Sequence, residues 1–172
     1  MTHAVVLALF DDALAAATAA RRIRELGVPR ERVSIVARSH DEEGAVARAS
    51  GGSPGSEIED SKRASRLGEL SAHLLAAIAL VMPGIGPIVA DGPLAAGLGE
   101  AAGHLAGGVA RTLEHAGLAR TDAHQWESQI RAGAFLVGVH VPDSEVAGIS
   151  EALERSGGRQ VTAGSWPDGS GG

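Results

Sequence analysis

The sequence predicts a mixed α+β fold in which two βαβ units are separated by a long insertion. An apolar run, an alanine-rich helical pattern and a β-branched segment follow one another near the start of the chain. A similar succession recurs near its end, and the 39–131 segment between the two copies is glycine-rich. With 172 residues, 44% of them hydrophobic, the chain can bury the core of one domain that carries a large insertion.

The first unit begins with an apolar strand at residues 4–10 (AVVLALF). Two aspartates then cap a helix over 12–26, and Gly27 ends it. Residues 32–38 (RVSIVAR) combine β-branched side chains with charged flanks, which is typical of a second strand.

The second unit has a strand at 134–141 (AFLVGVHV), a helix at 144–156 and a last strand at 160–166 (QVTAGSW). Two such units form the ferredoxin-like split βαβ frame. Because 4–10 and 134–141 are almost continuously apolar, we expect them to be adjacent central strands. The other two strands carry polar residues, which predicts that they lie at the edges of the sheet, with both helices on one face.

Alternation along the central strands predicts two faces of unequal size. One face carries the larger side chains, namely Val5, Leu7, Leu9, Phe135, Val137 and Val139. The other is small and apolar, with Ala4, Ala8, Ala134 and Gly138. One face suits the two helices, and the other needs a cover. That cover is either the insertion or a second copy of the protein.

The domain organisation follows from these patterns. We expect a discontinuous ferredoxin-like α+β domain at 1–38 and 132–166, a glycine-rich helical hairpin insertion at 39–131 and a flexible tail at 167–172. Within the insertion, the pattern predicts helices over 57–82 and 94–116 and a short third helix over 122–130. The hairpin turn between the two long helices is marked by Pro83, Gly84, Gly86 and Pro87.

A glycine stripe runs along the second arm of this hairpin. Gly99, Gly103 and Gly107 recur every four residues, which places them on one helical face. A stripe of this kind lets another backbone approach closely. We therefore expect a packing and interaction seam against the facing arm or another subunit.

Composition excludes several classes of function. The net charge of −6 and the 2% aromatic content argue against nucleic-acid binding, which needs basic surfaces and stacking platforms. With no cysteine, the chain has no disulfides and no thiolate sites.

No basic secretory signal precedes the first apolar run, so we expect a cytoplasmic protein. Membrane association is the alternative, because the uncharged run between Glu69 and Asp91 has nearly the length of a membrane span.

The motifs that could carry chemistry are weak. Residues 51–55 (GGSPG) match G-x-S-x-G, but no buried strand precedes the serine, so we interpret them as a loop. Glu100 and His104 lie one helical turn apart as a candidate polar pair, without a recognised metal-ligand spacing. His140, in a central strand, is interpreted as a partly buried histidine with satisfied hydrogen bonds. We expect no catalytic residue, metal or cofactor.

Three features of the chain occur together: the first strand with its alanine-rich helix, residues 80–88 (LVMPGIGPI) and the return from Trp126 through 131–137 (RAGAFLV). In these features the chain resembles the bacterial general stress proteins of the heat-induced type. This resemblance implies a stress-response role without an established catalytic residue set. Trp126 stands where the family pattern suggests tyrosine, and either residue supplies an aromatic anchor.

Three candidate functions follow. The first is a non-enzymatic general-stress-response protein that acts through protein-protein or membrane-surface contacts of its hairpin. The alternatives are a ferredoxin-like small-ligand sensor and a membrane-associated hairpin protein. The expected partners are a second copy or another protein, with peripheral membrane association as the alternative and no nucleic acid.

Overall fold

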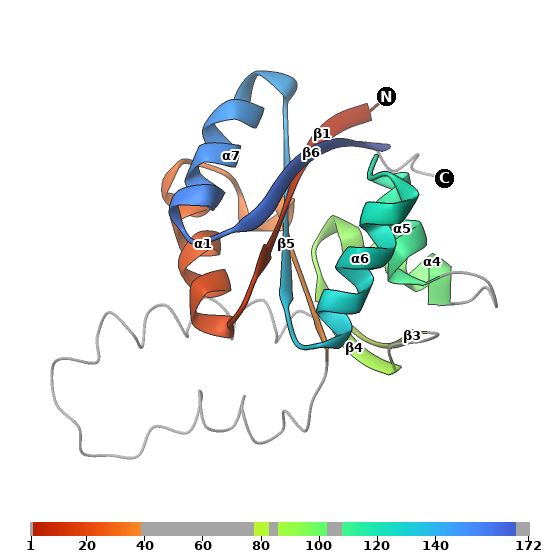
Figure 1. The fold of residues 1–172 in the computed structure, drawn as a ribbon. Helices are drawn as coiled ribbons and strands as arrows, with labels where there is room; N and C mark the ends of the chain where they lie inside the picture. Colours follow the sequence, from red (N-terminus) through yellow and green to blue (C-terminus); the bar gives the residue numbers. More distant parts are fainter. Residues whose placement is uncertain (1, 39–77, 83–85, 103–107, 168–172) are drawn as a thin grey trace, which may run out of the picture.

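The computed structural model describes residues 2–38, 78–82, 86–102 and 108–167 (Figure 1). Within these ranges the fold is α+β, with a six-stranded antiparallel sheet in the order β3-β4-β2-β5-β1-β6. Helices α1 and α7 cover one face of the sheet, and α4, α5 and α6 lie against the other (Figure 1).

The elements of the two βαβ units match the predicted ones closely. They are β1 (Thr2–Phe10), α1 (Ala13–Glu25), β2 (Val33–Arg38), β5 (Phe135–Val141), α7 (Val146–Arg155) and β6 (Arg159–Pro167), with 3-10 turns η1 (Arg30–Arg32) and η2 (Asp143–Glu145). The predicted cap is confirmed, because Asp12 Oδ1 accepts the Ala15 N–H at 2.8 Å. Gly27, at a φ of +93°, ends α1 with a backbone conformation that favours glycine.

The predicted central pair is confirmed. β1 and β5 are neighbours in the middle of the sheet, and β6 lies at one edge. The prediction that 32–38 forms an edge strand is wrong, because β2 pairs with β5 on one side and with β4 on the other. Its polar Ser34 is fully buried and hydrogen-bonded inside the protein, so a polar residue in a strand did not mark an edge here.

The insertion adds two strands to this sheet. These are β3 (Ile78–Met82) and β4 (Gly86–Asp91), so the predicted helix over 57–82 is wrong at its C-terminal end. An uncharged run rich in β-branched residues is compatible with either structure, and the open side of β2 favours a strand. Of the four turn residues, Gly86 and Pro87 open β4, opposite Met82 and Val81, while Pro83 and Gly84 lie outside the described residues.

The predicted long helix over 94–116 is two helices in the structure. They are α4 (Pro93–Ala102) and α5 (Val109–His115), and Gly108 precedes α5 with extended backbone at φ −113° and ψ −174°. Glycine lowers helix propensity by about 1 kcal/mol per residue, and five glycines between 97 and 108 favour such a break. The predicted helix over 122–130 is confirmed as α6 (Arg120–Arg131).

The pairing register corrects the predicted composition of the two faces. Val6 lies opposite Val139, and Leu7 lies opposite Gly138. Opposed residues point to the same face, so the odd-numbered residues of β1 share their face with the even-numbered residues of β5. Alternation defines two faces for each strand, but only the register decides which faces combine.

Both faces are covered by this chain itself. The prediction that the helices of the two βαβ units share one face is confirmed, because α1 and α7 pack on Val6, Val137 and Val139. On the other face, α4, α5 and α6 of the insertion pack over Leu7, Leu9 and Leu136. Trp126 of α6 is 2% exposed within this second cluster, as expected of an anchor. The insertion therefore supplies the cover that the sequence left open between itself and a second copy.

Candidate functional site

A cleft of about 530 Å³ opens at the end of the sheet where β1 begins and β5 ends. Residues from β1, η1, α4, β5 and η2 contribute to it. Its lining consists of Thr2, His3, Arg32, Pro93, His140, Val141, Pro142 and Asp143. The cleft thus lies at a junction between the βαβ units and the first helix after the β3–β4 hairpin.

The inner wall of the cleft holds a chain of polar side chains. His140, from the central strand β5, is 2% exposed, and its Nδ1 lies 2.8 Å from His3 Nε2. On its other side, His140 Nε2 lies 3.3 Å from Ser34 Oγ. The rings of His140 and Trp166 form a T-shaped pair, with centroids 5.8 Å apart. Both ring nitrogens of His140 thus have hydrogen-bond partners, as interpreted from the sequence, but the residue is buried rather than partly buried.

Ser34 connects this chain to the start of α4. The Leu94 N–H donates to Ser34 Oγ at 3.1 Å, so a serine from β2 satisfies one of the free N–H groups of the first helical turn. Gly92 just before the helix has a φ of +82°, and a Cβ there would stand 2.5 Å from the Val33 carbonyl oxygen. Glycine at this position lets α4 begin directly on β2, within reach of Ser34.

Burial dominates the electrostatics of His140. Desolvation, with a smaller contribution from neighbouring His3, lowers the pKa of His140 from its ordinary value of 6.5 to about 3. At neutral pH this imidazole is therefore uncharged and carries one donor and one acceptor nitrogen. The hydrogen bonds then run in one direction, either from Ser34 through His140 to His3 or the reverse.

This arrangement does not suit nucleophilic catalysis. Ser34 is 0% exposed and already accepts the Leu94 N–H, so a substrate cannot reach its hydroxyl in this structure. A histidine with a pKa of about 3 is also a weak general base at neutral pH. The cleft instead offers the His3 imidazole together with the Thr2 hydroxyl, the Arg32 guanidinium and the Asp143 carboxylate.

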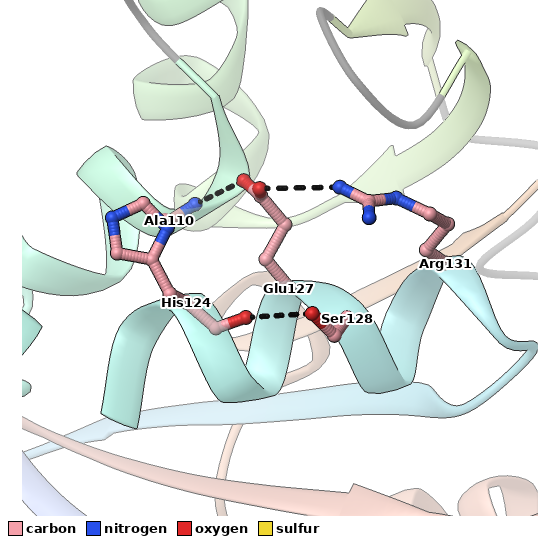
Figure 2. A network of polar contacts seen from close by, with 5 residues as sticks. All are labelled: Ala110, His124, Glu127, Ser128 and Arg131. Atoms are coloured by element: carbon pink, nitrogen blue, oxygen red, sulfur yellow. Dashed lines mark hydrogen bonds and ion pairs between the residues drawn. The ribbon is translucent and has the colours of Figure 1, made fainter. Parts of the chain in front are cut away.

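A second polar cluster joins α5 to α6 (Figure 2). Glu127 Oε2 accepts the Ala110 N–H at 2.8 Å in the first turn of α5, and Glu127 Oε1 lies 3.6 Å from Arg131 Nη2. In the same helix the Ser128 hydroxyl donates to the His124 carbonyl at 3.1 Å (Figure 2). Glu127 acts here as a capping residue from the neighbouring helix, which gives the cluster a structural role.

Several predicted site residues cannot be placed at this cleft. Gly99 and Glu100 belong to α4, whereas Gly103, His104 and Gly107 lie outside the described residues. The glycine seam and the Glu100–His104 pair therefore stay predictions.

The sequence analysis missed His3 and Ser34. In sequence, His3 is 137 residues from His140 and Ser34 is 106 residues from it. The available signal was the pairing of β1 with β5. This pairing places Val5 opposite His140, and His3, two residues before Val5 on the same face of β1, then lies next to His140.

Comparisons with protein-family models, curated proteins and solved structures found no significant match. The resemblance to general stress proteins therefore rests on the residues that carry it. Within the described part of the chain, no group of three or more histidine, aspartate or glutamate side chains is arranged to hold a metal ion. Among the described helices, none combines the length and the apolar character needed to cross a bilayer.

Proposed function

We propose that this protein is a non-enzymatic small-ligand-binding module on a ferredoxin-like split βαβ frame. The order β2-β5-β1-β6 supports the frame, because the first strands of the two βαβ units are central and their last strands flank them. In this proposal, β4 and β3 extend the frame beyond β2, and the ligand binds in the cleft at the start of β1.

The observation that carries the proposal is the hydrogen-bonded chain His3–His140–Ser34. Buried polar groups are unfavourable unless each has a partner, and an apolar residue at position 140 would need none. Here three polar side chains from three strands are aligned, and two of them line an open cleft. Such convergent polar groups in a cleft are typical of ligand sites.

The lining indicates the class of ligand. A volume of about 530 Å³ suits a small molecule, and the side chains around it offer both hydrogen-bond donors and acceptors. Arg32 and Asp143 add one charge of each sign. We infer a small polar ligand with hydrogen-bonding groups and mixed or anionic charge, such as an amino acid, a dicarboxylate or a mononucleotide.

Nuclear magnetic resonance tests this proposal. Histidine ring resonances of the labelled protein are recorded with amino acids, dicarboxylates and mononucleotides at millimolar concentration. We expect one class to shift the His3 and His140 signals. Thr2→Trp should abolish these shifts, because the new ring fills the cleft. Thr121→Trp, at an exposed position on α6, is the matched control that should preserve them. Shifts that survive Thr2→Trp, or none with any class, would contradict the proposal.

The biological setting is a second proposal. The resemblance carried by residues 80–88 and 131–137 supports a role in the bacterial general stress response. Assembly through the insertion is a further proposal, which rests on the sequence spacing of Gly99, Gly103 and Gly107 alone, because of these three only Gly99 lies in a described helix. Light scattering on the purified protein measures that assembly directly.

A further inference from the structure

Two charged side chains of opposite sign line the cleft without pairing. They belong to Arg32, which ends the turn η1, and to Asp143, which begins the turn η2. Within the described part of the chain, neither the Arg32 guanidinium nor the Asp143 carboxylate forms a hydrogen bond or an ion pair. Both residues are exposed, so a molecule that enters the cleft meets one full charge of each sign.

The backbone fixes both residues at the same end of the sheet. η1 comes directly before β2, and η2 follows β5, the strand that pairs antiparallel with β2. Each turn follows a proline and is closed by a backbone hydrogen bond. The Arg32 N–H donates to the Pro29 carbonyl at 3.0 Å, and the Glu145 N–H donates to the Pro142 carbonyl at 2.9 Å. The cost of ordering the backbone is therefore met before a ligand binds.

We propose that the ligand of the cleft is a small zwitterion of the amino-acid type, whose carboxylate binds Arg32 and whose ammonium group binds Asp143. This inference rests on the proposed function, because it assigns the charges of the ligand in that same cleft. A planar guanidinium can donate two parallel hydrogen bonds to one carboxylate, and an aspartate accepts hydrogen bonds from an ammonium group. A free amino acid and a short peptide both carry this pair of charges.

Charge balance favours a zwitterion over the purely anionic classes. A dicarboxylate or a mononucleotide would bring a second negative charge toward Asp143, and like charges repel. The imidazole of His140 supplies no compensating positive charge at neutral pH, because its pKa is about 3. The remaining wall of the cleft suits an aliphatic side chain, since it is formed by Pro93, Val141 and Pro142.

The test measures dissociation constants from the ring resonances of the two cleft histidines. The ligands are L-leucine, leucyl-leucine, 4-methylpentanoate, which lacks the ammonium group, and isopentylamine, which lacks the carboxylate. We expect a zwitterion to bind at least about 5-fold more tightly than either analogue with one charge, which corresponds to one charged contact at an exposed position. The tighter of L-leucine and leucyl-leucine shows whether an amino acid or a short peptide fits, and either result supports the zwitterion.

Two neutral variants assign the charges to residues. In Arg32→Gln, the preferred zwitterion should bind no more tightly than isopentylamine, and in Asp143→Asn, no more tightly than 4-methylpentanoate. Arg120→Gln and Asp122→Asn, at exposed positions on α6 outside the cleft lining, are the matched controls that should keep the wild-type preference. All four positions are exposed, so we expect every variant to fold, and thermal melts verify this.

The outcomes separate this inference from the proposed function. Equal affinities for the zwitterions and an analogue with one charge overturn the inference, and so does a wild-type preference that persists in Arg32→Gln or Asp143→Asn. Shifts caused by a dicarboxylate or a mononucleotide, but by neither zwitterion, also overturn it and leave the proposed function standing. If no ligand of any class shifts the histidine signals, both fall.

Discussion

The two faces of the sheet are packed in different ways. Under α1 and α7 the buried residues are all hydrophobic, with five buried positions in α1 of which four are alanine. Under α4, α5 and α6 the core holds larger side chains together with Ser34, Thr112 and His140. These three are the buried polar residues of the described part of the chain, and all lie on the insertion side.

Close contacts at glycine occur on both sides of the sheet, since a Cβ at Gly158 would stand 3.2 Å from Ala8 Cβ on the face of α1 and α7. A Cβ at Gly138 would stand 2.8 Å from Leu94 Cδ1, and one at Gly97 would stand 2.8 Å from Trp166 Cη2. Thr112 Oγ1 has no hydrogen-bond partner, which is unfavourable by about 1–3 kcal/mol. The difference between the two faces therefore lies in the buried polar groups, which are found on the insertion side and include His140 at the cleft. Sites that bind ligands commonly show this difference.

The largest effect is expected from truncating one large side chain on each face. Phe10→Ala removes a fully buried ring under α1 and α7, and Trp126→Ala removes the anchor of α6. Each should lower the free energy of unfolding by about 3–5 kcal/mol. Urea denaturation measures both, and Leu26→Ala, at a residue 58% exposed, should stay within about 0.5 kcal/mol of the wild type.

If Phe10→Ala and Trp126→Ala lower the free energy of unfolding equally and each variant unfolds in a single transition, both faces belong to one cooperative core. If Trp126→Ala left the main transition in place, the insertion would instead be a separately unfolding cover, and the comparison of the two faces would lose its basis.

Acid should affect the insertion face through His140. The pKa of this residue is about 3 in the folded protein and 6.5 when unperturbed, so the unfolded chain binds the proton more tightly. Stability from neutral His140 is fully present above pH 6.5 and is lost as pH falls from 6.5 toward 3. The slope is at most about 1.4 kcal/mol per pH unit.

Denaturation at several pH values in this window measures that slope. His140→Gln should flatten it, whereas His124→Gln, at an exposed position, should not. Identical slopes for wild type and His140→Gln would show that burial of the imidazole has no energetic consequence.

The smallest effect concerns the space at Gly138. Gly138→Ala would press on the end of the flexible Leu94 side chain and on Leu7, with an expected loss of about 1–3 kcal/mol by overpacking. Leu94→Val in the same protein should recover part of that loss, because the two positions share one space. Gly148→Ala in α7 is the control: nothing lies within 4 Å of the added Cβ, so higher helix propensity should stabilise it by up to about 1 kcal/mol. Equal melting temperatures for Gly138→Ala and wild type would contradict this account.

The predictability of the fold follows the range of the interactions involved. The strands and helices of the two βαβ units could be predicted because hydrophobic periodicity and the Asp12 cap act over a few residues. The strand at 78–82 could not be predicted, because an uncharged run without a polar face is compatible with a helix or a strand until a partner strand is known. Among the site residues, the sequence pointed to His140 because it lies in an apolar central strand. His3 and Ser34 belong to no local sequence motif, so the sequence did not identify them.

By itself, the sequence determined the succession of elements in the two βαβ units and the central place of β1 and β5, because these depend on local periodicity and on how apolar each strand is. Tertiary structure decided the rest. It placed β4 beside β2, set the register that pairs Leu7 with Gly138, and brought His3 and His140 together across 137 residues. These outcomes depend on how whole faces fit one another, and a shift of one residue in register would exchange every side chain between the two faces.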